Sequence, residues 1–368
     1  TDVTKLPVKA TADKLVIRNA QGKDVTDKLK ITKIDGTIKV TPAALTITTP
    51  KAEKVYDGNA LTAEGSITGF VNGETATFVT TGSQTEVGNS KNTYTLTWDG
   101  TAKETNYTVS DSVGTLKVTK QSIVPDPNNP ESYKDVTIDD PSDATYDGKE
   151  HKWSPVVTDK DGNELKEGTD YEVSYNKDDF TNVTGEIKVT ITGKGNYTGT
   201  VDKTYQITPK AVIITTDSDT RVFNDQPLTA PGRVDGIVAG ETYEFTVTGT
   251  QTYVGSSANS YQMTWAKKGE NEYTAKKSNY KVEENIGTLT VTDGTPENPV
   301  TPSLVVNKTH DTDKTYKAGD VITFTITVKN IYDEAKTITL EEQEGVTLDK
   351  TTFENVKPGK EITAAAAY

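Results

Sequence analysis

Apolar and polar residues alternate along most of the chain, and this alternation predicts short β-strands. The clearest runs are DYEVSYN at 170–176, EIKVTITG at 186–193 and TVDKTYQIT at 200–208. A period of two places one face of a strand on a core and the other face in solvent. Thr, Val and Tyr are frequent in these runs, and all three favour pleated, half-buried strands. We therefore expect an all-β fold built of small antiparallel sandwiches, with strands of about five residues.

A long internal repeat organises these strands. Residues 42–98 align without a gap to residues 209–265, and about half of the positions are identical. Both copies close on Gly-Thr-Leu-x-Val-Thr, at 114–119 and 287–292. A third closing strand, IDGTIKVT at 34–41, has no opening half before it. Repetition at this length indicates modules in series, each a separate small fold.

The expected modules follow from these boundaries. We predict a truncated β repeat at 1–41, two copies of the long repeat at 42–120 and 209–293, a different small module at 132–208, and a last sandwich at 303–368 that is incomplete. Proline marks the linkers 121–131 and 294–302, which we expect to be stiff and extended. The junction at 208–210 has almost no linker, so the modules there should abut. An elongated, monomeric rod is the expected arrangement.

Composition indicates modules with small hydrophobic cores and disfavours several classes of binding partner. Hydrophobic residues make up 32% of the chain, below the globular average of about 45–50%. The net charge of −14 disfavours nucleic acid and anionic membrane surfaces. No apolar run approaches the length of a membrane span, and no secretion signal is visible. The absence of Cys in 368 residues resembles exported proteins of Gram-positive bacteria.

Short motifs in each module resemble repeats of bacterial cell-surface adhesins. The two long repeats resemble the MBG/YDG type through Y-D-G…L-T, G…V-x-G-E-T, T-G-x-Q-T-x-V-G, N-Y and the closing G-T-L-x-V-T. Residues 132–208 look like a bacterial Ig-like repeat, through YDGK and G-K-G-N-Y-x-G-T. Residues 303–368 resemble DUF11-like modules, through Y-x-A-G-D-x-I-T-F-T-I-T-V-K-N.

The resemblance implies a large exported protein that is attached to the cell wall. Its repeats would form a stalk, or would bind host glycoprotein such as mucin. Two alternatives stay open: direct binding of mucin or glycans by these modules, and accessory modules of a carbohydrate-active enzyme whose catalytic domain lies elsewhere. The secretion signal and sorting motif that such proteins carry are not visible in these residues.

Candidate chemistry is sparse, and we expect no enzyme, no cofactor and no metal. The two histidines, His151 and His310, fall in different modules, although nucleophilic catalysis needs a base beside its nucleophile. Asp159, Asp161 and Asn163 alternate like part of a calcium loop, but a hairpin turn is the favoured interpretation. Lys308 lies where an intramolecular Lys–Asn crosslink would begin. The Asn-x-Thr triplets are interpreted as turn or strand residues: Asn106, Asn182, Asn196 and Asn307.

Tyrosine is the most suggestive surface feature. Tyr243 and Tyr253 in the second long repeat replace Ala76 and Glu86 of the first. Exposed Tyr supplies rigid contact area and stacks on sugar faces, so these two are candidate ligand contacts. Cross-strand packing is the favoured alternative.

A Tyr-Asp-Gly step recurs and marks chain reversals rather than catalysis. Residues 56–58 and 146–148 read YDG, and the aligned residues 223–225 read FND. Asn and Asp both tolerate the left-handed conformation of a tight turn, whereas a catalytic carboxylate would not be replaced by Asn. The predicted turn residues are Asp57, Gly58, Asp147, Gly148, Asn224 and Asp225. We expect Tyr56, Tyr146 and Phe223 to anchor these turns to their own cores.

Overall fold

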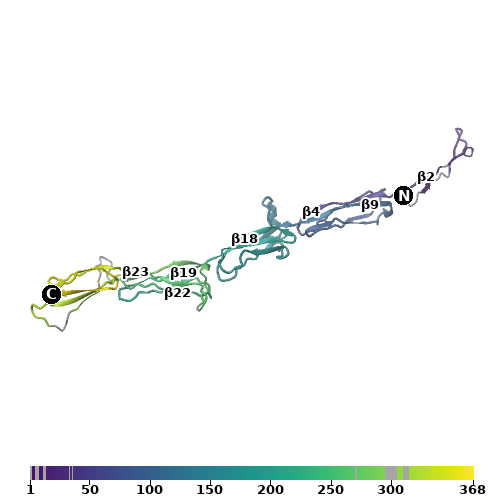
Figure 1. Cartoon of the computed structure of the whole chain (residues 1–368). Helices are drawn as coiled ribbons and strands as arrows, with labels where there is room; N and C mark the ends of the chain where they lie inside the picture. Colours follow the sequence, from purple (N-terminus) through teal and green to yellow (C-terminus); the bar gives the residue numbers. More distant parts are fainter. Residues whose placement is uncertain are drawn as a thin grey trace. The chain divides into compact units, whose positions relative to one another are not determined.

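The computed structural model confirms the all-β class. It describes residues 2–4, 8–10, 14–32, 34, 36–269, 272–294, 305–309 and 315–368. Figure 1 shows strands and loops throughout, and the described residues contain 3-10 turns but no α-helix. The chain forms two compact units: residues 1–141, 154–176 and 188–204 make the first, and residues 142–153, 177–187 and 205–368 make the second.

The first unit begins with a small hairpin and a loop. β1 (Val8–Ala10) pairs antiparallel with β2 (Gly36–Ile38), and the 3-10 helix η1 (Thr26–Lys28) lies between them. The Thr4 N–H donates to the Val40 carbonyl at 3.3 Å. The predicted closing strand at 34–41 is therefore present over 36–38.

The first long repeat is built of three small sheets. Its central strands are β3 and β10, and every second residue of β3 is buried, including Leu45 and Ile47 at 0% exposure. The sheets are β5-β3-β9, β4-β10-β7 and β6-β8. The elements are β3 (Ala43–Thr49), β4 (Ala52–Val55), β5 (Ser66–Thr68), β6 (Thr77–Thr80), β7 (Gly88–Lys91), β8 (Tyr94–Thr97), η2 (Glu104–Asn106), β9 (Tyr107–Val113) and β10 (Thr115–Thr119).

The sheets of this repeat are mixed rather than purely antiparallel. β3 pairs in parallel with β9 in the register Ala43↔Tyr107, and β4 pairs in parallel with β10. Parallel strands cannot be joined by a tight hairpin. The chain therefore forms β4 to β8 after β3 and only then returns as β9 to pair with β3. Period-two alternation predicts a strand and its buried face, but it carries no information on the direction of the neighbouring strand.

The second long repeat has the same architecture. β19 pairs in parallel with β25, and β20 pairs in parallel with β26, as in the first repeat. The labelled strands β19, β22 and β23 lie within the green part of the second unit in Figure 1. The elements are β19 (Lys210–Thr216), β20 (Asp219–Val222), β21 (Gly232–Asp235), β22 (Glu244–Val247), β23 (Gly255–Ala258), β24 (Tyr261–Thr264), η4 (Lys277–Asn279), β25 (Tyr280–Asn285) and β26 (Thr288–Thr292).

Residues 121–208 contain the three strands that alternation predicts most clearly, and they contribute to both units. The strands at 171–175, 186–193 and 200–208 belong to the sheet β13-β18-β16-β15. The elements are β11 (Gln121–Ser122), η3 (Pro130–Lys134), β12 (Val136–Ile138), β13 (Ala144–Thr145), β14 (Val157–Asp159), β15 (Tyr171–Tyr175), β16 (Glu186–Gly193), β17 (Tyr197–Thr198) and β18 (Thr200–Thr208).

The prediction of an extended spacer at 121–131 is wrong. Residues 121–122 form β11, which pairs in parallel with β17. A turn follows, in which the Asn128 N–H donates to Asp126 Oδ1 at 2.9 Å. Pro130 then opens η3, at a helix position where a missing N–H costs little. The predicted linker at 294–302 lies outside the described residues except for Gly294.

The last module is a two-sheet sandwich. Its sheets are β27-β28-β32-β30 and β29-β31. Ile326, Val328 and Ile338 form the centre of its core. The elements are β27 (Val305–Thr309), β28 (Thr323–Lys329), β29 (Lys336–Thr339), β30 (Thr347–Leu348), β31 (Thr352–Val356) and β32 (Glu361–Ala367).

A buried Asn ties each long repeat together. Asn92 is 0% exposed, and its Nδ2 donates to the carbonyls of Pro50 (3.1 Å) and Ala63 (2.9 Å). Its backbone N–H donates to the Gly114 carbonyl. Gly114 must be Gly because a Cβ there would lie 2.2 Å from the Pro50 carbonyl oxygen. Asn259 makes the same bonds in the second repeat.

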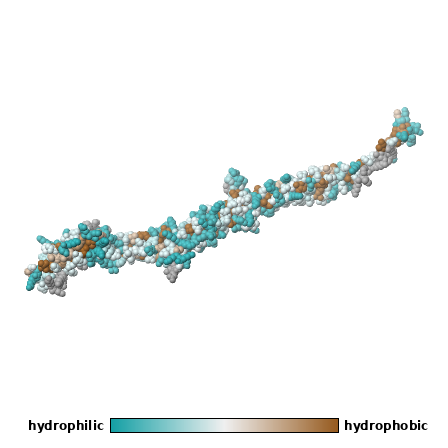
Figure 2. All heavy atoms as spheres, in the orientation of Figure 1, coloured by the Kyte–Doolittle hydropathy of each residue, from teal (hydrophilic) through white to brown (hydrophobic). Residues whose placement is uncertain are grey.

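The surface is mostly polar. On the face that Figure 2 shows, apolar residues form small groups among hydrophilic ones. Within the described part of the chain, no helix has the length and apolar character needed to cross a membrane.

Candidate functional site

Three turns of one geometry follow an aromatic residue. We call residues 56–58, 146–148 and 223–225 the aromatic turns. In each, the second residue accepts a backbone N–H through its side chain, with the pairs Asp57–Asn59 (2.9 Å), Asp147–Lys149 (2.9 Å) and Asn224–Gln226 (3.1 Å). In each, the third residue is left-handed, with φ of 79° at Gly58, 80° at Gly148 and 61° at Asp225. Asp and Asn thus perform the same structural task here.

The turn carboxylates are held in the ionised form. Lys54 Nζ lies 2.6 Å from Asp57 Oδ1, and this bond together with the Asn59 N–H lowers the pKa of Asp57. The Lys149 N–H and His151, whose Nε2 lies 2.8 Å away, lower the pKa of Asp147. A general acid or base needs a pKa near the working pH. These two groups are set up for turn formation instead.

In the first unit, the aromatic turn of the first repeat meets an Asn-Tyr pair of the next module. The Tyr56 and Tyr197 rings lie edge to face, 5.6 Å between centroids at 80°. Asn196 Oδ1 accepts the Val87 N–H at 3.0 Å, and its Nδ2 donates to the Glu86 carboxylate. The turn 56–58 therefore contacts the following module as well as its own, and the sequence did not predict this second contact.

The second unit contains the same contact between the next two modules. Tyr146 and Tyr280 lie edge to face, 5.5 Å apart at 84°. Asn279 Oδ1 accepts the Val183 N–H at 3.0 Å, and its Nδ2 donates to Asn182 Oδ1 at 2.8 Å. We call this arrangement the clasp: an Asn-Tyr pair holds the aromatic turn and the x-Val step, 86–87 or 182–183, of the module before it.

Glu241 adds a polar centre to the second clasp. Its two carboxylate oxygens accept the hydroxyls of Tyr146 and Tyr280, one from each module. The Tyr280 hydroxyl also accepts the Val238 N–H at 3.0 Å. Tyr146 is only 3% exposed, and burial followed by the Glu241 bond raises the pKa of Tyr146 to about 12. Both tyrosines therefore stay neutral donors at physiological pH.

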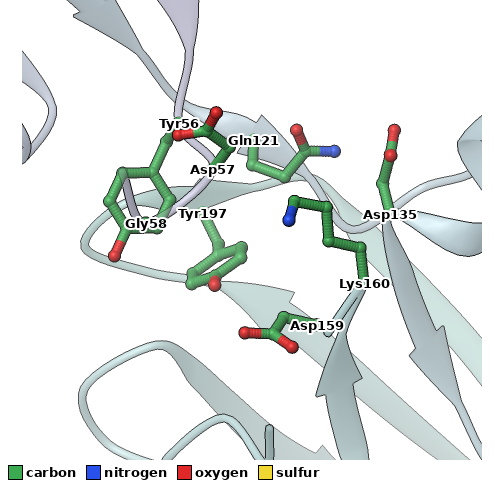
Figure 3. Close-up of a pocket in the computed structure, with 8 residues that line it drawn as sticks. All are labelled: Tyr56, Asp57, Gly58, Gln121, Asp135, Asp159, Lys160 and Tyr197. Atoms are coloured by element: carbon green, nitrogen blue, oxygen red, sulfur yellow. The ribbon is translucent and has the colours of Figure 1, made fainter. Parts of the chain in front are cut away.

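A cavity lies beside the first clasp. It measures about 80 Å³ and is lined by Tyr56, Asp57, Gly58, Gln121, Asp135, Asp159, Lys160 and Tyr197. Figure 3 shows the two tyrosine rings on one side, with Lys160 and Asp159 reaching in from a second segment. Small-molecule sites usually measure about 300–1,000 Å³. This cavity has room for a few waters only.

Tyr253 packs at the boundary with the last module. Its ring stacks on Phe223 at 6.4 Å and 19°, and its hydroxyl would lie 2.1 Å from a Cβ on Gly359. The next N–H, that of Val254, donates to the Ile331 carbonyl at 2.7 Å. Tyr253-Val254 is thus a third x-Val step that contacts a following module. Tyr243 is half-buried directly before β22, and it is part of no such contact.

Residues 2–3 contact the first long repeat in the manner of an x-Val step. The Val3 N–H donates to Asn106 Oδ1 at 2.8 Å, and Asn106 Nδ2 donates to Asp2 Oδ1 at 3.0 Å. These bonds match those of Val183 and Asn182 with Asn279. They connect the start of the chain to the end of the first repeat that carries η2.

The remaining candidate chemistry does not assemble into a site. Asp159 Oδ1 accepts the N–H groups of Asp161 and Asn163, both at 2.9 Å, in the hairpin turn that we favoured over a calcium loop. Among the described residues, no three His, Cys, Asp or Glu side chains are placed to hold a metal ion. Lys308 lies on β27 opposite Ile326. His310 lies outside the described residues.

Comparison with known proteins supports the resemblance for one module. Residues 45–117 match the family model of the MBG domain (YGX type). The first MBG repeat thus spans β3 to β10. Among curated proteins, no sequence matches the chain. One similar solved structure is that of Sidekick-1 immunoglobulin domains 1-5, with 9% identity, a TM-score of 0.25, and coverage of 90% of this chain and 76% of that chain. So low a TM-score carries no argument, and the fold stands on the strand pairing above.

Sequence reasoning missed the role of the Asn-Tyr pairs. It noted N-Y as a motif of the repeats, and it interpreted Asn106, Asn182 and Asn196 only as turn or strand residues within Asn-x-Thr triplets. All three take part in contacts between modules. Recurrence of Asn-Tyr before the closing strand of three successive modules, at 106–107, 196–197 and 279–280, was the available signal.

Proposed function

We propose that the chain is a non-enzymatic repeat segment of a bacterial cell-surface adhesin, in which clasps join small β-sandwich modules into an extended stalk. The observation that carries the proposal is the recurrence of one clasp in two units of the chain. Each clasp fixes the orientation of one module against the next. It does so through edge-to-face rings and an Asn side chain that both accepts and donates hydrogen bonds, and the second clasp adds buried tyrosine hydroxyls. A repeated contact of this kind holds neighbouring modules in one orientation, which serves a stalk rather than catalysis or flexible linkage.

The cellular setting is part of the same proposal. The full-length protein would be exported and held at the wall of a Gram-positive cell, with the last module of the DUF11-like type. A net charge of −14 keeps such a stalk soluble and apart from other acidic surfaces. Short, docked junctions transmit orientation along a stalk, and this would hold a binding region away from the cell.

Spin-label distances across one clasp test the stalk function. The chain has no Cys, so Thr95→Cys on β8 and Thr200→Cys on β18, both at exposed positions, provide two unique label sites in the first unit. We expect a narrow distance distribution in the otherwise natural chain. Asn196→Ala combined with Glu86→Ala should broaden it, while Asn128→Ala, which lies away from the clasp, should not. A broad distribution in the natural chain would contradict the proposal.

Direct binding of mucin or host glycans is a second candidate. One observation favours it: a groove of about 270 Å³ on the second repeat is lined by Ile214, Tyr261, Trp265, Lys277, Val282 and Glu284. Aromatic rings in a groove stack on sugar faces. A mucin-binding assay on the chain and on its Tyr261→Ala variant separates the two candidates. Binding that is lost in the variant would favour glycan recognition, and no binding by the natural chain would favour the stalk.

A further inference from the structure

The end of the first MBG repeat that carries Glu74, Val71 and Tyr107 has the same construction as the occupied end of the second repeat. The Tyr107 hydroxyl accepts the Val71 N–H at 3.2 Å and donates to Glu74 Oε2 at 2.7 Å. The Tyr280 hydroxyl accepts from Val238 and donates to Glu241 in the same way. We call residues 70–74 with Asn106 and Tyr107 the receiving face.

In the second repeat, an aromatic turn covers this face. The Tyr146 hydroxyl donates to the Glu241 oxygen that Tyr280 does not bind, and the rings of Tyr146 and Tyr280 lie edge to face. Gly148 lies so close that a Cβ there would be 3.0 Å from Val238 Cγ1. A segment that binds this face therefore needs a tyrosine hydroxyl, an aromatic ring and a glycine in the arrangement of this turn.

In the first repeat, half of this arrangement is filled. Asp2 and Val3 form hydrogen bonds with the Asn106 side chain, as Asn182 and Val183 do with the Asn279 side chain. The other half is open within the described part of the chain, where Glu74 Oε1 receives no hydrogen bond. Val71 is 43% exposed, although it aligns with Val238, which the turn covers.

We propose that the receiving face binds the Tyr-Asp-Gly turn of another repeat module. The tyrosine hydroxyl of that turn would donate a hydrogen bond to Glu74 Oε1, and its ring would lie edge to face with Tyr107. The glycine of the turn would pack against Val71. The chain's own turns do not compete, because those at 56–58 and 146–148 are engaged in clasps and that at 223–225 packs against Tyr253. This inference rests on the proposed stalk function and names the partner surface of one stalk module.

The entry to the first repeat suits such a partner. Thr41-Pro42 directly precedes β3, as Thr208-Pro209 directly precedes β19 in the aligned repeats. β18 ends at Thr208, so the middle module runs into the second repeat without a linker. A module that ends at Thr41 would be joined to the first repeat as closely as the middle module, which ends at Thr208, is joined to the second repeat.

A graft tests the proposal on the otherwise complete chain. A second copy of residues 121–208, which includes β11 and η3, replaces residues 1–41, so that its final Thr runs directly into Pro42. Hydrogen exchange is then followed by mass spectrometry in the peptide 70–76. We expect exchange at Val71 to slow by about tenfold relative to the natural chain. Changing the grafted Tyr146 to Phe should remove much of this protection, because the ring stays but the hydroxyl bond to Glu74 is lost.

The outcomes separate the two proposals. Equal exchange at Val71 in grafted and natural chains would overturn the inference. A grafted copy whose own strands are unprotected would also count against it, because the face is proposed to hold that module as the second repeat does. The natural clasp is the internal control: Tyr146→Phe at the original position should speed exchange at Val238. If that control fails as well, the proposed stalk function fails with it.

Discussion

At the scale of residues, the aromatic turns show how one geometry is kept with different chemistry. Asp57 and Asn224 occupy aligned positions, and each accepts the N–H two residues on. Only Asp57 adds a charge, paired with Lys54 at 2.6 Å. The charge therefore contributes an electrostatic interaction that Asn224 cannot supply, while the turn itself depends on an oxygen acceptor.

Asp57→Asn should leave the turn intact and change its response to acid. The pKa of Asp57 is lowered from 3.8 by Lys54 and Asn59, so its contribution is present above pH 3.8 and is lost as the pH falls through the lower folded pKa. We expect a small loss at pH 7, roughly 0.2–1 kcal/mol for an exposed pair, and a flatter dependence of Tm on pH below about 4. Melting curves between pH 2 and 7 measure both.

The control for this variant is already in the chain. Asn224→Asp in the second repeat should add acid sensitivity rather than remove it, because a new carboxylate then accepts the Gln226 N–H. Identical pH profiles for Asp57→Asn and the natural chain would show that the carboxylate contributes nothing.

At the scale of elements, the buried Asn and a nearby Gly hold together segments of one repeat that are distant in the sequence. Asn92 satisfies the carbonyls of Pro50 and Ala63, and Gly114 permits the close approach of the closing strand. Alternation alone could predict β3 and β10 and their buried faces. The parallel pairing of β3 with β9 and the long-range bonds of Asn92 join residues far apart in the sequence, which no local pattern encodes.

Asn92→Ala should destabilise the first repeat strongly. The carbonyls of Pro50 and Ala63 would lose their donor in part-buried hydrogen bonds, at a cost of about 1–3 kcal/mol each before any rearrangement. Denaturant unfolding of the variant, compared with Asn89→Ala on the exposed face of β7, measures the difference. A loss no greater than that of Asn89→Ala would contradict the assigned role.

The clasps also predict a response to alkali. Burial raises the pKa of Tyr146 and of Tyr197 to about 12, above the unfolded value of about 10. Their contribution is therefore complete below pH 10 and is lost as the pH rises from 10 to 12. A tyrosinate absorbance titration with parallel circular dichroism should show late-titrating residues whose ionisation coincides with loss of structure.

Variants assign that alkaline transition. Tyr146→Phe combined with Tyr197→Phe should reduce the late-titrating absorbance by two residues relative to the natural chain. If the double variant titrates like the natural chain, the clasp tyrosines are not the buried ones.

At the scale of the whole molecule, sequence reasoning defined the long repeats but did not predict the contacts between modules. Gapless alignment of 42–98 with 209–265 and the recurring closing strand defined the long repeats, and the MBG match at 45–117 supports the first. The prediction failed at 121–131, where proline was interpreted as a spacer although Pro130 opens η3 and residues 121–122 pair with β17. Contacts such as Asn196 with Val87 join residues 109 positions apart, beyond any local pattern.

The central claim is that clasped modules form an extended, non-enzymatic stalk, and small-angle X-ray scattering tests it most directly. A compact chain of 368 residues would have a radius of gyration of about 21 Å. The account predicts a value well above this, with a rod-like scattering profile that is independent of protein concentration. Asn196→Ala combined with Asn279→Ala should change the profile toward that of a flexible chain. A radius of gyration near 21 Å for the natural chain would contradict the account.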